Sequence, residues 1–292
     1  MIQKAFILGA GLGTRLRPLT NVLPKPLVPI FHEPMANYAL RHCQAAGVSE
    51  FAINTHHLPE AWQEAYPDSE FAGSPLHFFH ENILLETGGG IQNIASFIGN
   101  DPLLIYNGDI LTDIDISQLI HAHEQSGNVA TLALRSSGEN CNVSISGDRV
   151  FDMRNILHET PGTHQFTGIY CIQPEILQLI PKGEVISVVP AFIELIKQEK
   201  LGAVVLDEGD WFDIGNPVAY RDIHEHLRKQ RQDAIHPSAN IHPSASICKS
   251  SCIIGPNTHI EADTKLKNTI VWPGVTVTSG ASLDGEILTG RN

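Results

Sequence analysis

The sequence predicts an α/β fold, with a mostly parallel sheet covered by helices on both faces and a short repetitive region at the C-terminal end. Two observations carry this prediction. Short apolar runs alternate with amphipathic helical segments before residue 232. After residue 234 an aliphatic residue recurs roughly every six positions. The expected strands are residues 5–8, 51–54, 76–79, 103–106 and 129–134, and the expected helices are residues 35–46, 90–98, 116–125 and 219–231.

Composition fits a soluble intracellular protein. The chain has 292 residues, of which 42% are hydrophobic, and this is enough for a core of about 200–250 residues. No apolar run approaches the roughly 18–20 residues that span a bilayer, and the N-terminus lacks a signal-peptide pattern. We therefore expect a cytoplasmic protein without a membrane partner.

The cysteines do not form a recognisable framework. The chain has 5 of them, an odd and scattered set, which argues against disulfides. Cys248 and Cys252 lack a second ligand pair at zinc spacing, so we expect both to be small core-facing residues.

A glycine-rich turn follows the first expected strand. Gly9, Gly11 and Gly13 are close enough together for backbone N–H groups to surround phosphate oxygens. The protein carries a formal net charge of -13, yet no Asp or Glu occurs before Glu33. An acidic protein repels anions, so this basic segment is the expected site for an oligophosphate, and nucleic acid is not an expected partner. Its positive side chains near the turn are Arg15, Arg17 and Lys25.

Lys25 lies between Pro24 and Pro26. Proline fixes its own φ and disfavours helical conformation in the residue before it, so we expect Lys25 to be extended and nearly rigid. A rigid backbone would aim its ammonium group at a bound anion.

Two familiar phosphate-binding patterns do not fit the turn. The dinucleotide fingerprint needs a third glycine beyond Gly13 and an acidic residue at the end of the second strand, where the chain has Asn54. The Walker phosphate loop needs a Gly-Lys-Ser/Thr sequence, which is absent.

Carboxylates are expected near the same edge of the sheet. Asn107 and Asp109 follow the strand at residues 103–106, and ligands of such sheets collect at the carboxyl ends of the strands. Asp213 precedes a helix that Asn216 would cap. Asp109 is thus a candidate metal ligand, and Asp213 is its candidate partner.

The run from Gly9 to Pro29, with Arg15, Arg17 and Lys25 in place, resembles the signature of the sugar-1-phosphate nucleotidyltransferases, also called nucleotide-sugar pyrophosphorylases. The resemblance implies a Rossmann-like nucleotidyltransferase fold. It also implies transfer of a nucleoside monophosphate from a triphosphate to a sugar 1-phosphate, with release of pyrophosphate. The Leu-Glu-Thr-Gly-Gly-Gly spelling before Ile91 is most similar to N-acetylmuramate-1-phosphate uridylyltransferase and mannose-1-phosphate guanylyltransferase members.

The resemblance also implies roles for individual residues. Magnesium would be bound by Asp109 and Asp213. Catalysis is expected from four residues that converge on the phosphates: Arg15, Lys25, Asp109 and Asp213. The expected nucleotide-binding residues are Gly11, Gly13, Thr14, Arg15, Lys25, Glu81 and Gly88. The expected sugar-binding residues are Asn107, Asn142, Thr167 and Gly168.

The substrates stay partly open. The chain lacks the Glu-Lys-Pro motif by which many glucose- and mannose-specific relatives hold the sugar phosphate, so the sugar is not fixed. The resemblance implies uracil or guanine as the base, supplied as UTP or GTP, and leaves the choice between them open. A sugar phosphate is itself an anionic nucleophile, so the main obstacle is repulsion between the two substrates.

The repeat beginning at Ile235 resembles a hexapeptide-repeat, left-handed parallel β-helix of about three coils. We expect a catalytic domain over residues 1–231 and a β-helix domain over residues 232–292, with the latter assembling a homo-oligomer. A hexapeptide acyltransferase using His242 or His259 is the less favoured alternative, because so short a repeat offers little acyl-donor cleft.

Two other functions remain as alternatives. A catalytically silent regulator of similar architecture would show divergence at the motif residues, whereas Arg15, Lys25, Asp109 and Asp213 are all present. A phosphocholine cytidylyltransferase of the same fold would need aromatic residues around a quaternary ammonium, and only 7% of this chain is aromatic.

Overall fold

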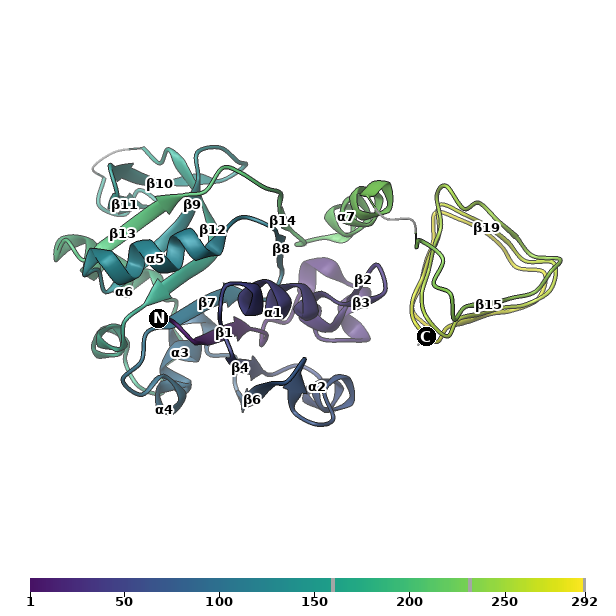
Figure 1. The fold of residues 1–292 in the computed structure, drawn as a ribbon, viewed down its shortest axis with the longest axis horizontal. Helices are drawn as coiled ribbons and strands as arrows, with labels where there is room; N and C mark the ends of the chain where they lie inside the picture. The colour runs from purple at the N-terminus through teal and green to yellow at the C-terminus, as the bar shows by residue number, and fades with distance from the viewer. Residues whose placement is uncertain (159–160, 231–232, 291–292) are drawn as a thin grey trace. The chain divides into compact units, whose positions relative to one another are not determined.

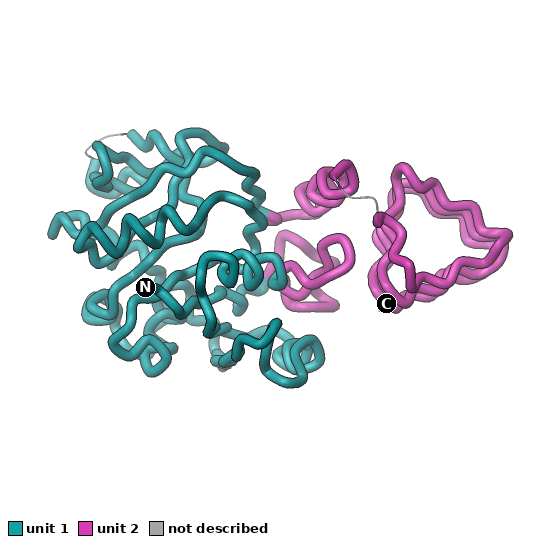
Figure 2. The backbone as a smooth tube through the Cα atoms, in the orientation of Figure 1, with its two compact units in different colours: residues 1–12, 36–213 teal, residues 13–35, 214–292 magenta. Residues whose placement is uncertain are grey.

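The computed structural model describes residues 1–158, 161–230 and 233–290. The chain divides into two compact units, shown in Figure 2. Unit 1 comprises residues 1–12 and 36–213, and unit 2 comprises residues 13–35 and 214–292. The boundary expected between residues 231 and 232 lies outside the described residues.

Unit 1 is built on a ten-stranded sheet with the order β10-β11-β13-β9-β12-β7-β1-β4-β6-β5 (Figure 1). The strands are β1 (Lys4–Leu8), β4 (Glu50–Thr55), β5 (Glu70–Phe71), β6 (Ser74–His80), β7 (Leu103–Asn107), β9 (Ala130–Arg135), β10 (Cys141–Ser146), β11 (Arg149–Met153), β12 (His164–Ile172) and β13 (Leu201–Val205). All five expected strands are present, each within a few residues of its expected bounds.

The sheet is mixed in direction. Strands β7, β1, β4 and β6 run parallel to one another, and so do β9 and β13. Strand β12 runs antiparallel to both β7 and β9, and β10 and β11 form an antiparallel hairpin. The expectation of a mostly parallel sheet therefore holds for one half only. A parallel partner needs a crossover of a dozen or more residues, and the short connection between β10 and β11 cannot provide one.

Helices cover both faces of the sheet. On one face, Phe6 and Ile105 pack in a cluster with Ile91 and Phe192, which belong to α3 and α6. On the other face, His42 of α1 contacts the Tyr106 hydroxyl at 3.1 Å, as alternation of side chains along a strand requires. The helices of unit 1 are α1 (Met35–Ala45, whose first residue belongs to unit 2), α2 (Pro59–Ala65), α3 (Glu86–Asn93), α4 (Ala95–Ile98), α5 (Ile116–Ser126), η4 (Pro174–Leu179) and α6 (Val189–Lys197).

One helix prediction needs correction. The helix expected at residues 90–98 begins earlier, at Glu86, and is interrupted at Ile94, where the backbone leaves the helical region and α4 starts separately. The glycines at positions 88–90 therefore lie inside α3 and do not precede it.

The N-terminal part of unit 2 is held by polar contacts from α7 (Pro217–Gln230). The Tyr220 hydroxyl donates to the Pro29 carbonyl at 2.7 Å, and the Phe31 N–H donates to His224 Nε2 at 3.0 Å. Asn216 caps α7, as expected, by accepting from the N–H groups of Val218 and Ala219. The short elements of residues 13–35 are η1 (Thr14–Leu16), η2 (Leu19–Asn21), η3 (Lys25–Leu27), β2 (Pro29–Ile30) and β3 (Glu33–Pro34).

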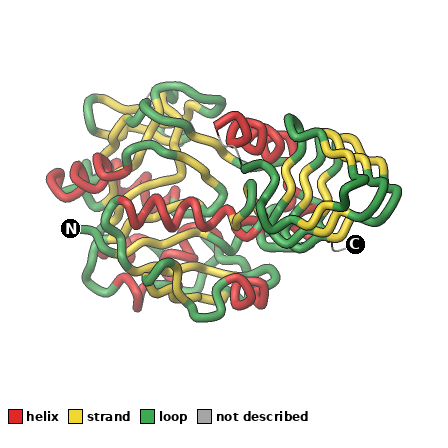
Figure 3. The backbone as a smooth tube through the Cα atoms, turned by 45° about the vertical axis from the view of Figure 1, so that its right-hand side comes forward, coloured by secondary structure: helices red, strands yellow, loops and turns green. Residues whose placement is uncertain are grey.

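Residues 233–290, here called the coil region, form three parallel three-stranded sheets (Figures 1 and 3). Each sheet takes one strand from each of three successive turns of the chain, with Ile241, Ile260 and Val277 in register in the first. The strands are β15 (Asn240–Ile241), β16 (Ser246–Ile247), β17 (Ile253–Ile254), β18 (His259–Ile260), β19 (Lys265–Lys267), β20 (Ile270–Val271), β21 (Thr276–Val277), β22 (Ser282–Asp284) and β23 (Ile287–Leu288).

The cysteines are free thiols, as expected from their scatter. Cys252 is buried, but Cys248 is half-exposed and contacts the Ser250 hydroxyl, so its predicted core position is wrong. Among the described residues, no helix combines the length and the apolar character that a membrane crossing demands.

Candidate functional site

The ends of β1 and β7 bring the glycine turn and the first carboxylate motif to one edge of the sheet. Leu8 pairs with Asn107, and the Gly108 N–H donates to the Leu8 carbonyl at 3.1 Å. Gly9 and Gly108 are therefore the first residues beyond this pair, and Asp109 follows Gly108 directly. The predicted gathering of polar groups at the carboxyl ends of parallel strands is present here.

Asp213 lies beside Asp109 because two short strands pair. Strands β8 (Ile110–Thr112) and β14 (Trp211–Asp213) are antiparallel, and Asp213 is in register with Ile110. The pair is reinforced by the Asp113 carboxylate, which accepts from the Asp210 N–H at 2.5 Å. Asp213 is exposed and Asp109 is half-buried.

This pair of carboxylates is the protein's part of a candidate magnesium site. Within residues 1–158, 161–230 and 233–290, no group of three or more His, Cys, Asp and Glu side chains could hold a metal ion. A complete protein-made cage is therefore absent from the described chain. Magnesium is typically held by one or two carboxylates with substrate phosphates and water, and Asp109 and Asp213 fit that donor set.

The glycine loop, residues 9–14, contains glycines with different structural demands. A Cβ on Gly9 would lie 2.8 Å from the Asn54 carbonyl oxygen and 2.9 Å from the Trp62 ring. Gly13 has φ +58°, and its Cβ would lie 2.8 Å from Thr20. A Cβ on Gly11 would meet no described atom within 4 Å. Protein packing thus explains Gly9 and Gly13, whereas the space at Gly11 is open to a ligand.

Lys25 is fixed differently from the expectation. It begins a 3-10 turn, η3, in which the Leu27 N–H donates to the Pro24 carbonyl at 2.8 Å. The backbone is therefore turned rather than extended, because that hydrogen bond outweighs the preference of a residue before proline. Lys25 is 7% exposed, and its Cβ lies 3.1 Å from the position of a Cβ on Gly13. Lys25 thus packs against Gly13 within unit 2.

The other positively charged side chains of the N-terminal segment differ in their exposure and in their ion pairs. Thr14, Arg15 and Arg17 are exposed. Lys4 instead forms an ion pair with Asp101 at 2.7 Å and donates to the Phe97 carbonyl. Its charge supports the fold, which leaves Arg15, Arg17 and Lys25 as the cations of the predicted phosphate site.

The structure brings two of the predicted sugar-binding residues together. A Cβ on Gly168, which has φ +81°, would lie 2.6 Å from the Asn107 amide nitrogen, so the two positions are in contact. Thr167 is fully buried and donates to the Ala133 carbonyl at 2.8 Å, which occupies its hydroxyl. Its carbonyl accepts from the Trp211 indole N–H at 3.0 Å, and this links β12 to the strand that carries Asp213.

Asn142 lies on β10, where the neighbouring Cys141 pairs with Gln165 of β12. It is half-buried, and its carbonyl accepts from the Arg154 N–H at 2.7 Å. These contacts place its backbone in the β10–β11 hairpin. Its contact with a sugar stays a prediction.

Glu81 and Gly88 are engaged by protein groups. Glu81 is 2% exposed, and its carboxylate accepts from the Asn54 amide at 2.7 Å and from the Leu85 N–H at 2.9 Å. A Cβ on Gly88 would lie 2.8 Å from the Ser187 carbonyl oxygen. The close approach at this glycine is therefore made by residues 184–187 of the protein itself, because that segment packs across the start of α3.

Three residues with clear structural roles here were missed by sequence reasoning: Asn54, Arg135 and Trp211. Arg135 donates to the carbonyls of Asp207 and Gly209 at 3.1 Å each, which anchors the loop before β14. Asn54 could have been found, since it ends a buried strand with a polar side chain as Asn107 does. Arg135 and Trp211 carried no such signal.

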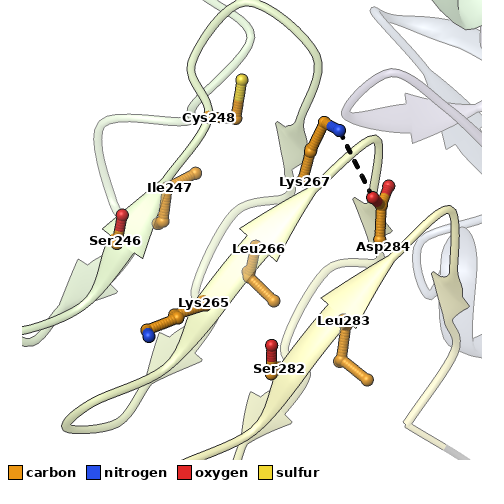
Figure 4. Close-up of a pocket in the computed structure, with 9 residues that line it drawn as sticks. All are labelled: Ser246, Ile247, Cys248, Lys265, Leu266, Lys267, Ser282, Leu283 and Asp284. Atoms are coloured by element: carbon orange, nitrogen blue, oxygen red, sulfur yellow. Dashed lines mark ion pairs between the residues drawn. The ribbon is translucent and has the colours of Figure 1, made fainter.

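A cavity of about 380 Å³ lies on the middle sheet of the coil region (Figure 4). Its rim includes Cys248 and the ion pair of Lys267 with Asp284, whose charged atoms are 3.5 Å apart. None of the predicted catalytic, nucleotide-binding, sugar-binding or metal-binding residues lines it.

Comparison with curated proteins finds relatives that match most of the chain. A mannose-1-phosphate guanylyltransferase of Mycobacterium tuberculosis is 28% identical, covering 96% of this chain and 82% of the relative. An N-acetylmuramate alpha-1-phosphate uridylyltransferase of Neisseria meningitidis is 30% identical, covering 73% of this chain and 93% of the relative.

Solved structures share the fold. A UDP-glucose pyrophosphorylase complexed with UDP-glucose superposes with a TM-score of 0.68 at 20% identity, covering 79% of this chain and 100% of that structure. A UTP-bound enzyme of the same type from Acinetobacter baumannii has a TM-score of 0.68 at 19% identity, covering 80% of this chain and 95% of that structure. These neighbours support the nucleotidyltransferase α/β fold. The family model described as nucleotidyl transferase matches residues 4–230, and the chain belongs to that family.

Proposed function

We propose that the protein transfers a nucleoside monophosphate from UTP or GTP to a sugar 1-phosphate, with release of pyrophosphate and dependence on Mg²⁺. The observation that carries the proposal is the pairing of β8 with β14. It sets Asp213 opposite Ile110, next to Asp109, at the edge where β1 ends and the glycine loop begins. The printed activities of the relatives, guanylyl and uridylyl transfer to sugar phosphates, agree with it.

The described side chains divide the work by charge. Asp109 and Asp213 would hold Mg²⁺, which supplies neutralisation of phosphate charge when bound. Arg15 and Lys25 would bind triphosphate oxygens, and the open space at Gly11 would let the backbone approach them. The sugar phosphate oxygen attacks the α-phosphorus as the P–O bond to pyrophosphate breaks, so no side-chain nucleophile is needed.

We propose that Asn107 and Gly168 bind the sugar. The two positions are in contact with each other at the end of β7. The roles of Asn142 and Thr167 are proposed to be less direct, through the strands that carry them. The substrate panel described below distinguishes uracil from guanine and one sugar from another.

We also propose that the coil region is a left-handed parallel β-helix that assembles a homo-oligomer, and that a catalytic domain of residues 1–231 precedes it. The three parallel sheets of three strands support this reading. The outermost strands β21, β22 and β23 leave backbone groups at the edges of their sheets, which suits contact with another subunit.

The test is pyrophosphate release with a panel of UTP and GTP against mannose, glucose and N-acetylmuramate 1-phosphates, with and without Mg²⁺. Thermal shift with the same panel identifies the ligand that stabilises the fold by mass action. We expect turnover with one pair and Mg²⁺ only. Absence of turnover with every pair would favour a catalytically silent homologue.

Asp109→Asn is the decisive variant. We expect it to unfold at the wild-type temperature, because the amide has nearly the size and shape of the carboxylate that it replaces, and to lose Mg²⁺-dependent turnover by about 100-fold or more. Asp101→Asn, which alters a carboxylate paired with Lys4, is the control and should retain activity. Full activity of Asp109→Asn would remove this residue from the metal site.

A further inference from the structure

The first turn of the glycine loop is tied to the segment before α3 by two buried polar side chains. The Gly9 N–H donates to Asn54 Oδ1 at 2.7 Å, and Asn54 Nδ2 donates to Glu81 Oε1 at 2.7 Å. The other carboxylate oxygen of Glu81 accepts from the Leu85 N–H at 2.9 Å. One continuous hydrogen-bonded path therefore runs from the end of β1 to the residue that precedes α3.

This path is enclosed by the fold. Asn54 is 3% exposed and Glu81 is 2% exposed. A Cβ on Gly90 would lie 3.1 Å from Asn54 Nδ2 and 3.2 Å from Glu81 Oε1, so α3 closes over the pair. The Glu81 backbone is fixed as well, because its N–H donates to the Thr55 carbonyl at 2.8 Å. A buried carboxylate is costly unless its oxygens are satisfied, and here each oxygen has a donor.

The far end of the path is braced again. The Leu85 carbonyl accepts from the Ile186 N–H at 3.0 Å, and the Val188 N–H donates to Thr87 Oγ1 at 2.9 Å. Leu85 is thus held from both sides, by Glu81 and by the segment before α6. A shift in the Asn54–Glu81 contact would move either Gly9 or Leu85, since the rest of the path has little freedom.

We propose that Asn54 and Glu81 are positioning residues that set the glycine loop and the segment at residues 82–90 at a fixed distance from each other. Glu81 then acts through Leu85 and not by contact with the nucleobase. The inference rests on the proposed function and on the expectation that Gly11 and Gly13 in one segment and Gly88 in the other bind the same nucleotide.

The test exploits the hydrogen-bond chemistry of the pair. Glu81→Gln places an amide NH₂ against either the Asn54 NH₂ or the Leu85 N–H, two donors facing each other. Asn54→Asp places a second carboxylate against Glu81. In the double variant Asn54→Asp/Glu81→Gln, the carboxylate at 54 accepts from Gly9 and from the amide at 81, whose oxygen accepts from Leu85. All three hydrogen bonds are thereby kept, and only the one between positions 54 and 81 exchanges its donor and its acceptor.

We expect each single variant to lower kcat/KM for the nucleotide by about 10- to 100-fold, and the double variant to return within about threefold of the wild type. Glu194→Gln makes the same chemical change at a half-exposed position of α6 and should leave the kinetics unchanged. Hydrogen exchange at the Gly9 and Leu85 amides should quicken in the single variants and slow again in the double variant, which also covers a single variant too unstable to assay.

The outcomes separate the two proposals. An inactive wild type contradicts the proposed function and, with it, the role assigned to the pair. An active wild type whose single variants keep normal kinetics contradicts the positioning role alone. The same holds if the losses in the double variant multiply, or if only the unfolding temperature responds, because a merely structural pair would behave in that way.

Discussion

At the scale of single residues, protein packing constrains Gly9 and Gly13, whereas the space beside Gly11 is open. We expect Gly11→Ala to leave the unfolding temperature unchanged, because the added methyl group meets no described atom within 4 Å. The same methyl group would intrude on bound phosphate, so the KM for the nucleotide should rise by about tenfold or more. Thermal unfolding and steady-state kinetics on one preparation measure both quantities.

Gly9→Ala is the matched variant for that prediction. Its methyl group would lie 2.8 Å from a backbone oxygen of Asn54 and 2.9 Å from Trp62, neither of which can move freely. We expect a loss of stability of about 1–3 kcal/mol, typical of overpacking in a core. If Gly11→Ala proves to be the destabilised variant of the two, the assignment of open space to Gly11 is wrong.

His224 makes a second prediction at this scale. It is buried, donates from Nδ1 to the Tyr220 carbonyl at 2.7 Å and accepts at Nε2 from the Phe31 N–H, so both nitrogens are committed in the neutral form. Burial lowers its pKa to about 4 from 6.5. Between these values the unfolded chain binds a proton that the folded chain does not, so stability falls as the pH drops from about 6.5 to about 4, by about 3 kcal/mol in total.

Denaturant unfolding at pH 7 and at pH 5 checks this sign. His224→Gln removes the titrating group, so the variant should be less stable than the wild type at pH 7 but lose less on acidification. His123, whose pKa burial also lowers to about 4, remains in both proteins and contributes equally. Equal losses in the two proteins would mean that His224 does not titrate in this range.

Residue types at special positions were the most predictable part of the site. Asp109 was singled out because it follows a buried run, and Asp213 because it precedes the helix that Asn216 caps. The pairing of β8 with β14 brings these two segments together, and the metal-binding roles of both residues stay predictions. The hydrogen bonds of the buried Glu81 carboxylate could not be predicted from the sequence. Its burial depends on Asn54 of β4 and Gly90 of α3, which are distant from each other in sequence. A single chain gives no signal for such a contact.

At the scale of elements, periodicity predicted the strands of the parallel half well. The hairpin at residues 141–153 was missed because its strands are short and partly polar, with no strong alternation. The start of α3 was misplaced because glycines usually end helices, whereas here residues 184–187 pack where side chains would otherwise be. At α3, tertiary packing overrode local preference.

Helix α7 makes a prediction at this scale. Its Tyr220 hydroxyl donates to the Pro29 carbonyl and accepts from the Trp272 indole N–H at 2.9 Å, so one buried hydroxyl joins the segment after Lys25 to the coil region. Tyr220→Phe leaves both partners unsatisfied, and we expect a loss of about 1–3 kcal/mol with a raised KM for the nucleotide. Tyr66→Phe, which removes a hydroxyl bonded to Asn37, should lower stability alone.

Calorimetric unfolding and nucleotide kinetics distinguish these two tyrosines. A Tyr220→Phe protein with unchanged KM would show that the contact stabilises unit 2 without affecting Lys25. That result would leave the role of Lys25 itself intact.

At the scale of the whole molecule, the coil region has two kinds of contact to lose. Within unit 2 it provides the Trp272 N–H to Tyr220 and the Gly285 carbonyl to Arg221, the latter at 2.6 Å. Its outer strands β21, β22 and β23 present sheet edges suited to another subunit.

Truncation after Gln230 should therefore lower the oligomeric mass and also lower the unfolding temperature. We expect the oligomeric mass to change more than the turnover, since the predicted catalytic side chains all precede the truncation. Light scattering and thermal unfolding measure the two effects, and the variant Trp272→Phe in the full chain separates them, because it removes the hydrogen bond while keeping the sheet edges. A truncated protein of unchanged mass would rule out assembly through this region, whereas a folded monomer without turnover would give the region a catalytic role.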